Sequence, residues 1–181
     1  NVTLAIAPGT GPVGATLAGT ATVASVNGVA TFSGLSIAKA GTAYQLAATA
    51  AGLTSATSAA FNIATGPATQ VAFGTQPSNA SSGATISPAV TVRLLDAGGN
   101  LTNSTANVTL AIGNNAGPGG VLSGTTTVAA VNGVATFSGC HVDKAGTYTL
   151  TARSGSLATG QSTSFSITPG TASVSTSTLT A

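Results

Sequence analysis

The apolar residues of this chain recur at every second position rather than at every third or fourth. The alternation with Thr, Ser and Arg is clearest in four stretches, residues 90–95, 108–112, 148–152 and 165–167. A period of two predicts strands that bury one face. No stretch carries a helical stripe of more than two turns, and frequent Gly, Thr and Ser disfavour a long helix. We therefore predict an all-β protein.

One turn can be assigned from its dipeptide. Asn132-Gly133 separates the apolar runs 128–131 and 134–137, and Asn27-Gly28 stands in the same context earlier in the chain. A type I′ hairpin needs positive φ at both central residues, and Asn-Gly meets that need best. Both dipeptides are therefore predicted to form tight hairpins.

The chain contains an internal repeat. Residues 17–34 match residues 122–139 at 15 of 18 positions. The match extends back to NVTLAI at 1–6 and 107–112, and forward beyond Tyr44 and Tyr148, with an offset that drifts from 106 to 104. Such self-similarity is typical of a tandem array, and a period of about 105 residues suits one small β-sandwich.

The repeat predicts three segments. Residues 66–170 form a complete module, residues 1–65 form the C-terminal two thirds of another, and residues 171–181 are the start of a third module or a donor strand. The first module lacks everything equivalent to residues 66–106, which should expose Val2, Leu4 and Ile6. Two alternatives follow: the chain is a piece of a longer array, or another chain completes the module by strand exchange.

The pattern of about seven strands in about 105 residues predicts two sheets packed face to face. Asp143–Leu150, DKAGTYTL, resembles the approach to strand F of immunoglobulin-like domains, which makes Tyr148 the residue of a tyrosine corner. The stretches at 88–100, 132–137 and 144–152 resemble bacterial immunoglobulin-like repeats of invasin, intimin and large surface adhesins. This resemblance implies tandem Greek-key β-sandwich modules at a bacterial cell surface.

Charge restricts the partners. Charged residues make up 3% of the 181 residues and the net charge is +2, whereas an ordinary domain is about 25% charged. Such a surface cannot neutralise a row of phosphates, so nucleic acid is excluded as a partner. No run approaches the roughly 18 apolar residues of a membrane span, so no membrane insertion is expected. One cysteine excludes an internal disulfide framework.

Chemistry-bearing residues are few. His141 and Asp143 lie two positions apart on one face of a predicted strand, but Ser36 and Ala38 replace them in the other copy, and a metal needs more ligands. Cys140 aligns with Leu35 and is expected to be a small buried side chain. We predict no catalytic, cofactor-binding or metal residues and no enzymatic activity. Because Asp96 and Asp143 are the only acids, the calcium sites of several adhesin types are not expected.

The remaining polar motifs have ordinary structural explanations. Lys39 and Lys144 precede Ala-Gly and are expected to be solvated cations of a turn, and the segment 96–100, DAGGN, is a turn between two strands. N-x-Ser/Thr triplets are frequent by chance in a Thr-rich chain, and they are glycan acceptors only where the machinery exists. They begin at Asn1, Asn79, Asn100, Asn103 and Asn107.

These features favour a structural role. Near-identical repeats, short Pro-containing junctions and outward Thr, Ser and Ala predict an extracellular, cell-surface structural protein, the repeat unit of a stalk or filament whose partner is itself. A third hypothesis is a non-catalytic accessory region of a secreted polysaccharide-degrading enzyme. The main alternative is a spacer or a glycan- or protein-binding module of a bacterial surface adhesin, with the loop 113–120 as the contact. That loop lacks the aromatic and Arg residues that recognition sites favour, so a spacer is the better of the two.

Overall fold

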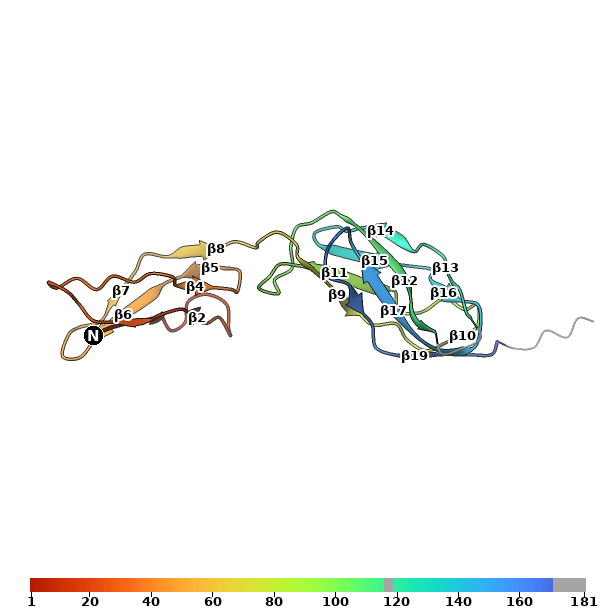
Figure 1. Cartoon of the computed structure of the whole chain (residues 1–181), viewed down its shortest axis with the longest axis horizontal. Coiled ribbons are helices and arrows are strands. Elements are labelled where there is room, and N and C mark those ends of the chain that lie inside the picture. Colours follow the sequence, from red (N-terminus) through yellow and green to blue (C-terminus); the bar gives the residue numbers. More distant parts are fainter. Residues whose placement is uncertain (116–118, 171–181) are drawn as a thin grey trace, which may run out of the picture. The chain divides into compact units, whose positions relative to one another are not determined.

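The computed structural model describes residues 1–115 and 119–170. Strands and turns make up the described residues, with no helix among them, which confirms the all-β prediction. The chain divides into two compact units (Figure 1). Unit 1 comprises Asn1–Ala68 and Leu95–Thr102, and unit 2 comprises Thr69–Leu94 and the residues from Asn103 onward.

The larger sheet of unit 2 has the order β10-β19-β17-β12-β14. These strands are β10 (Ala80–Ser81), β19 (Phe165–Thr168), β17 (Gly146–Arg153), β12 (Asn107–Asn115) and β14 (Thr127–Ala129). β10 pairs with β19 in parallel and the other neighbours are antiparallel. β18 (Gly160–Gln161) also pairs with β17.

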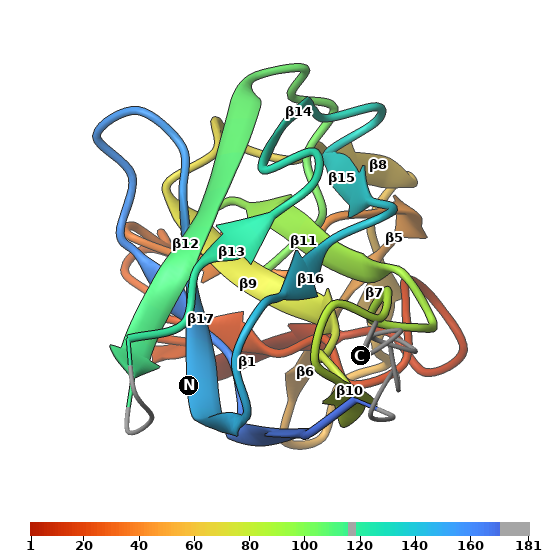
Figure 2. The same cartoon turned by 90° about the vertical axis from the view of Figure 1, so that its right-hand side faces the viewer.

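The second sheet of unit 2 has the order β15-β11-β9. Its strands are β9 (Gln70–Thr75), β11 (Val90–Leu95) and β15 (Val134–Phe137), and Figure 2 shows β9 and β11 side by side. A short pair, β13 (Leu122–Ser123) with β16 (His141–Val142), completes the unit. β14 and β15 flank the Asn132-Gly133 hairpin and belong to different sheets, so the chain crosses between the layers there.

The core of unit 2 lies between these two sheets. Alternate residues of the smaller sheet point inward and are at most 1% exposed: Val90, Val92, Leu94, Ala135 and Phe137. The larger sheet contributes residues at most 3% exposed: Val108, Leu110, Tyr148, Leu150, Ala152, Phe165 and Ile167. Apart from Ala135 and Phe137, these are positions that the period of two predicted, whereas Ile112, which it also predicted, is half-buried. Two layers with one shared core make unit 2 a β-sandwich.

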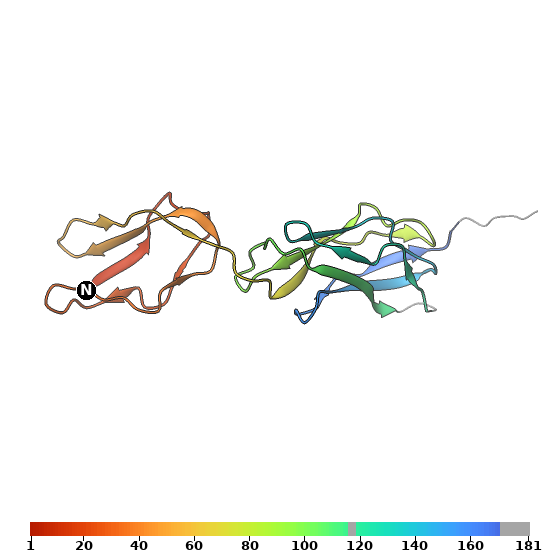
Figure 3. The same cartoon turned by 90° about the horizontal axis from the view of Figure 1, so that it is seen from above.

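Unit 1 repeats the larger sheet without β10, and it repeats the short pair; its strands can be followed in Figures 1 and 3. A four-stranded sheet has the order β3-β1-β6-β7, and two-stranded pairs are β2-β4 and β5-β8. The strands are β1 (Val2–Ile6), β2 (Leu17–Ala18), β3 (Thr22–Val23), β4 (Ser36–Ile37), β5 (Gly41–Tyr44), β6 (Leu46–Ala50), β7 (Ala56–Thr57) and β8 (Phe61–Ile63).

Unit 1 has no counterpart of β9, β10 or β11. The repeat aligns Asn1 with Asn107, and these three strands come before Asn107. The consequence is clearest at Val29–Phe32, which is identical in sequence to β15. In unit 2 those four residues pair with β11. In unit 1 they form no strand, and only an isolated bridge joins Val26 to Val29.

Both predicted Asn-Gly turns are confirmed, but the runs on either side of each turn pair only through one isolated bridge, Val131 with Val134 and Val26 with Val29. Asn132 and Gly133 have φ of 48° and 76°, and Asn27 and Gly28 have φ of 49° and 78°. Leu95–Thr102 belongs to unit 1, although it lies within the predicted second module. The predicted module boundaries at 65/66 and 170/171 stay predictions. The predicted start of a third module at 171–181 lies outside the described residues.

Candidate functional site: the apolar face of unit 1

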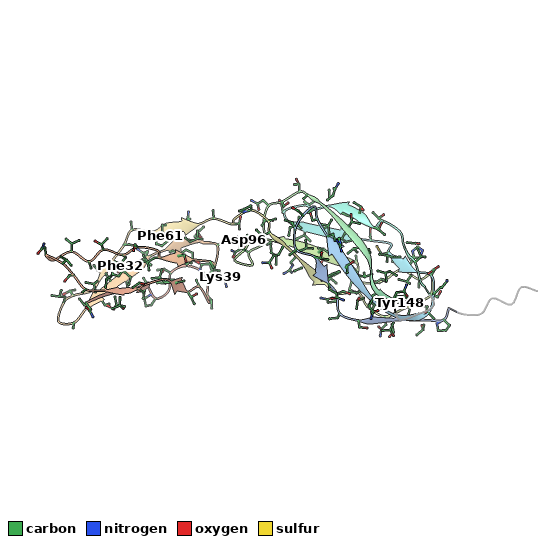
Figure 4. All side chains as sticks on the ribbon, viewed as in Figure 1. Phe32, Lys39, Phe61, Asp96 and Tyr148 are labelled. Atoms are coloured by element: carbon green, nitrogen blue, oxygen red, sulfur yellow. The ribbon has the colours of Figure 1, made fainter. Side chains whose placement is uncertain are left out.

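Unit 1 carries a hollowed apolar face on the side where unit 2 has its smaller sheet. The hollow has a volume of about 170 Å³. It is lined from β2, β4, β6 and β8 and from the residue before β4 by Leu17, Leu35, Ser36, Ile37, Leu46, Phe61 and Ile63. Phe61, labelled in Figure 4, contributes the aromatic ring. The six apolar side chains define what we call the unit 1 face.

The apolar residues of the unit 1 face are more exposed than their counterparts in unit 2. The exception is Leu17, which is half-buried like its counterpart Leu122. The counterparts Cys140, Val142, Leu150, Phe165 and Ile167 are at most 3% exposed. Leu35, Ile37, Leu46, Phe61 and Ile63 are all half-buried. Val2, Leu4 and Ile6, which were predicted to be exposed, are likewise half-buried. The counterparts Val108 and Leu110 are at most 3% exposed, whereas Ile112, the counterpart of Ile6, is half-buried too.

The face is held in shape by contacts inside unit 1. The Tyr44 hydroxyl donates to the carbonyl of Lys39 at 2.7 Å, and the ring of Tyr44 stacks on Phe61 with centroids 5.8 Å apart. Tyr44 is fully buried although the covering sheet is absent. A buried Tyr needs a partner for its hydroxyl, and Lys39, just ahead of β5, supplies it. The ring contact with Phe61 joins β5 to β8.

Unit 2 contains the same arrangement. The Tyr148 hydroxyl donates to the carbonyl of Lys144 at 2.9 Å, and the rings of Tyr148 and Phe165 lie 6.2 Å apart. The predicted tyrosine corner is therefore confirmed at Tyr148 (Figure 4) and is present at Tyr44 as well. One local device builds the same face in both units.

In unit 2 the segment Thr69–Leu94 also supplies hydrogen bonds to the rim of this face. Ile86 and Gly83 donate their amides to the carbonyls of Cys140 and Val142 at 2.8 and 2.9 Å. The amide of Ser82 donates to the carbonyl of Thr168 at 2.8 Å. Asn79 Oδ1 accepts from the amide of Ser166 at 2.7 Å. Unit 1 contains no counterpart of the segment that provides these groups.

Cys140 is buried, as its alignment with Leu35 predicted. It is 1% exposed, and its thiol donates to the carbonyl of Thr125 at 3.3 Å. Burial raises the pKa of the thiol, which keeps it protonated near neutral pH. Cys140 therefore serves as a small packing residue of the unit 2 core.

His141 and Asp143 are engaged in local hydrogen bonds. His141 Nδ1 lies 3.1 Å from the carbonyl oxygen of Gly139. Asp143 Oδ1 accepts from the amide of Val121 at 2.6 Å, and the Asp143 carbonyl accepts from the Ser82 hydroxyl. Across residues 1–115 and 119–170, no three His, Cys, Asp or Glu side chains gather as metal ligands would. Asp143 instead fastens two loops of unit 2.

The segment 96–100 forms the predicted turn, and the carboxylate of Asp96 closes this turn with hydrogen bonds. Asp96 Oδ1 accepts from the amides of Gly98 and Asn100, both at 2.9 Å, and Asp96 Oδ2 accepts from the amide of Gly66 at 2.9 Å. Asn100 Nδ2 donates to both carboxylate oxygens at 3.0 Å. These bonds, led by the one from the Asn100 side chain, lower the pKa of Asp96.

The other predicted polar residues are spread over turns. Lys39 Nζ donates to the carbonyl of Val13 at 2.7 Å, so this exposed cation also ties a loop of unit 1. Asn79 and Asn100 are engaged through the bonds given above, and Asn1, Asn103 and Asn107 are exposed. The loop 113–120 of the adhesin alternative lies in part outside the described residues. Sequence reasoning did not single out Phe61, Ile63 and Leu46 as a site, although their alignment with core residues of the complete module was the signal.

Comparisons with known proteins give no family. No protein-family model matches the chain, and no curated protein matches it. Among solved structures, it is similar to a β-glucuronidase of Parabacteroides merdae, with 18% identity and a TM-score of 0.42 over 70% of this chain and 16% of that one. The surface layer protein SbsC, domains 4–9, gives 16% identity and a TM-score of 0.41 over 71% of this chain and 18% of that one.

A glycosyl hydrolase family 2 member of Bacteroides cellulosilyticus gives 12% identity and a TM-score of 0.36, over 70% of this chain and 17% of that one. The chain thus spans less than a fifth of each of these proteins. The class of the protein is therefore set by its own strands, which make it an all-β protein of immunoglobulin-like β-sandwich architecture. In the described part of the chain, no helix has the length and apolar character to cross a membrane.

Proposed function

We propose that this chain is a non-enzymatic structural protein of the extracellular space, the repeat unit of a cell-surface stalk or filament. The observation that carries the proposal is that the residues shared by the two copies of the repeat are structural ones. The shared residues build turns and core: the Asn-Gly hairpins, the tyrosine corners and the apolar positions of the strands. A repeat that preserves packing and turns is suited to multiplying one fold along a chain.

The titratable side chains support the same proposal. Asp96, Asp143 and Lys39 each hold a backbone group of a turn or loop, and Cys140 is buried. General acid–base or nucleophilic catalysis needs such groups gathered around one open position. In this chain they are used instead to fix loops.

The outward faces of the sheets carry few charges, with Arg93 and Arg153 exposed on β11 and β17, and they are bonded by hydroxyls. Thr3 and Thr22 lie opposite each other on β1 and β3 with their hydroxyl oxygens 2.9 Å apart, and Thr109 and Thr127 repeat this contact at 2.9 Å in unit 2. Cross-strand Thr pairs stabilise a sheet, and low charge favours association with neighbouring copies. Both properties suit a structural array whose partner is itself.

Two measurements on the source cells test the proposal. Antibodies raised against residues 66–170 should label intact cells, and the labelled polypeptide on a denaturing gel should migrate as an array or a polymer of this chain. The same antibodies against permeabilised cells provide the reference signal. Labelling that appears only after permeabilisation would overturn the extracellular role, and purified material that stays isolated and monomeric under electron microscopy would overturn the filament.

A further inference from the structure

We propose that the unit 1 face binds a segment of the same sequence type as Thr69–Leu94, carried by the same polypeptide directly ahead of Asn1. This inference rests on the proposed function, because it assumes a tandem array, and it names the partner that one surface of the array requires. In unit 2 the equivalent face is covered by Thr69–Leu94.

The first step is the apolar match. In unit 2 the covering segment contributes five buried side chains, Val71, Ile86, Val90, Val92 and Leu94, at exposures of 6, 2, 0, 0 and 0%. They cover the counterparts of the unit 1 face, which are at most 3% exposed apart from the half-buried Leu122. Since Leu46, Phe61 and Ile63 are the same residue types as Leu150, Phe165 and Ile167, the same cover fits unit 1.

The second step is the backbone. β10 lies parallel to β19, with Ala80 opposite Ile167. The counterpart of β19 is β8, which pairs with β5 and has no second neighbour strand among the residues described for unit 1. An edge strand of this kind accepts a further strand by main-chain hydrogen bonds. A copy of Ala80–Ser81 therefore has an edge to join at Ile63 and Ala64, the counterparts of Ile167 and Thr168.

The third step is a strand that lacks its partner. β11 pairs with β15 in the register Val90 with Phe137 and Val92 with Ala135. Val29–Phe32 has the same four residues as β15 and forms no strand. A copy of β11 would pair with Val29–Phe32 and take the half-buried Phe32 (Figure 4) to the burial of Phe137, which is 1% exposed.

The fourth step distinguishes the source of the segment. A second copy of this chain holds its own Thr69–Leu94 inside its own unit 2, so donation would uncover the core of that unit. A segment ahead of Asn1 carries no such cost. In unit 2 the covering segment comes before Asn107 in the chain, and Asn107 is the counterpart of Asn1. The preceding segment is therefore the occupant that the repeat supports.

The experiment is to join a copy of residues 66–106 ahead of Asn1 in the full chain and to follow hydrogen exchange at residues 29–37 and 61–63. We expect exchange there to slow on the order of 100-fold or more relative to the unmodified chain, in a monomer. The matched control carries Val90→Asp and Val92→Asp in the added copy only, and should restore the fast exchange of the unmodified chain.

The outcomes separate the possibilities. Equal exchange with the added copy and with its double-Asp control would overturn the inference. Concentration-dependent protection of residues 29–37 in the unmodified chain, together with a dimer by light scattering, would overturn it in favour of a second copy. Either result is compatible with positive surface labelling, so the failure of this inference and the failure of the structural role can be told apart.

Discussion

Residues 29–32 and residues 134–137 have the same sequence, Val-Ala-Thr-Phe, and adopt different structures. The second copy is strand β15, with Ala135 and Phe137 at most 1% exposed, and the first copy forms no strand. Both follow the same Asn-Gly hairpin. What differs is β11, which is present beside β15 and absent from unit 1. Strand formation here is decided by a distant partner rather than by the local sequence.

Other features are alike in the two units because their partners are close in sequence. Tyr44 and Tyr148 are both fully buried, and each bonds a carbonyl four or five residues earlier. Gly19 and Gly124 both have positive φ, and at each a Cβ would collide with the carbonyl oxygen of Gly34 or Gly139. Local devices of this kind persist whether or not the second sheet is present.

The largest effect should follow from damaging β11 in unit 2. Val92 is fully buried, so Val92→Asp places a carboxylate in the core and should lower the free energy of unfolding of unit 2 by about 4 kcal/mol or more. Unit 1 should be unaffected. Chemical denaturation followed by circular dichroism measures the loss. The matched control is Arg93→Ala, at an exposed position of the same strand, with an expected change within about 0.5 kcal/mol.

The identical Phe residues should differ in their importance. Phe137→Ala removes a side chain that is 1% exposed and should cost unit 2 about 3–5 kcal/mol. Phe32→Ala removes a half-buried side chain and should cost unit 1 less than about 2 kcal/mol, because less of the side chain is taken from water. Denaturation of the two variants makes the comparison. Equal losses would show that Phe32 is packed as tightly as Phe137 in solution.

The two tyrosine corners should respond alike. Tyr148→Phe and Tyr44→Phe each remove one hydroxyl bond to a backbone carbonyl, at 2.9 and 2.7 Å, and should each lower the free energy of unfolding of their own unit by about 0.5–1.5 kcal/mol. Thermal unfolding of both variants measures this. A negligible effect at Tyr44 alone would mean that the corner is not formed where the second sheet is absent.

The smallest effect concerns pH. Hydrogen bonds, that from the Asn100 side chain first, lower the pKa of Asp96 below its ordinary value of 3.8. A lowered pKa stabilises the turn at pH above 3.8, and this stabilisation is lost as the pH falls through the pKa of the folded state. Asn100→Ala should raise the pKa towards 3.8. Carboxyl ¹³C chemical shifts against pH measure it, and an unchanged titration in the variant would contradict the assigned cause.

The sequence was sufficient where structure depends on short-range rules. The period of two placed the core residues Val90, Val92 and Val108, and the Asn-Gly dipeptides placed both tight turns. The sequence did not predict that Val29–Phe32 forms no strand while the identical residues of β15 do. The difference depends on pairing with β11, which lies about 40 residues earlier in the chain than β15. The unit 1 face was missed as a site since each of its side chains, taken alone, is an ordinary core residue.

Hydrogen exchange on the unmodified chain tests the central claim most directly, because both copies of Val-Ala-Thr-Phe are measured in one sample. We predict that the amides of residues 134–137 that bond to β11 are strongly protected, whereas residues 30–32, beyond the bridge of Val26 with Val29, exchange at rates close to those of an unstructured peptide. Equal protection of the two segments in a monomer would contradict the account, since it would show that the sequence forms this strand without its partner.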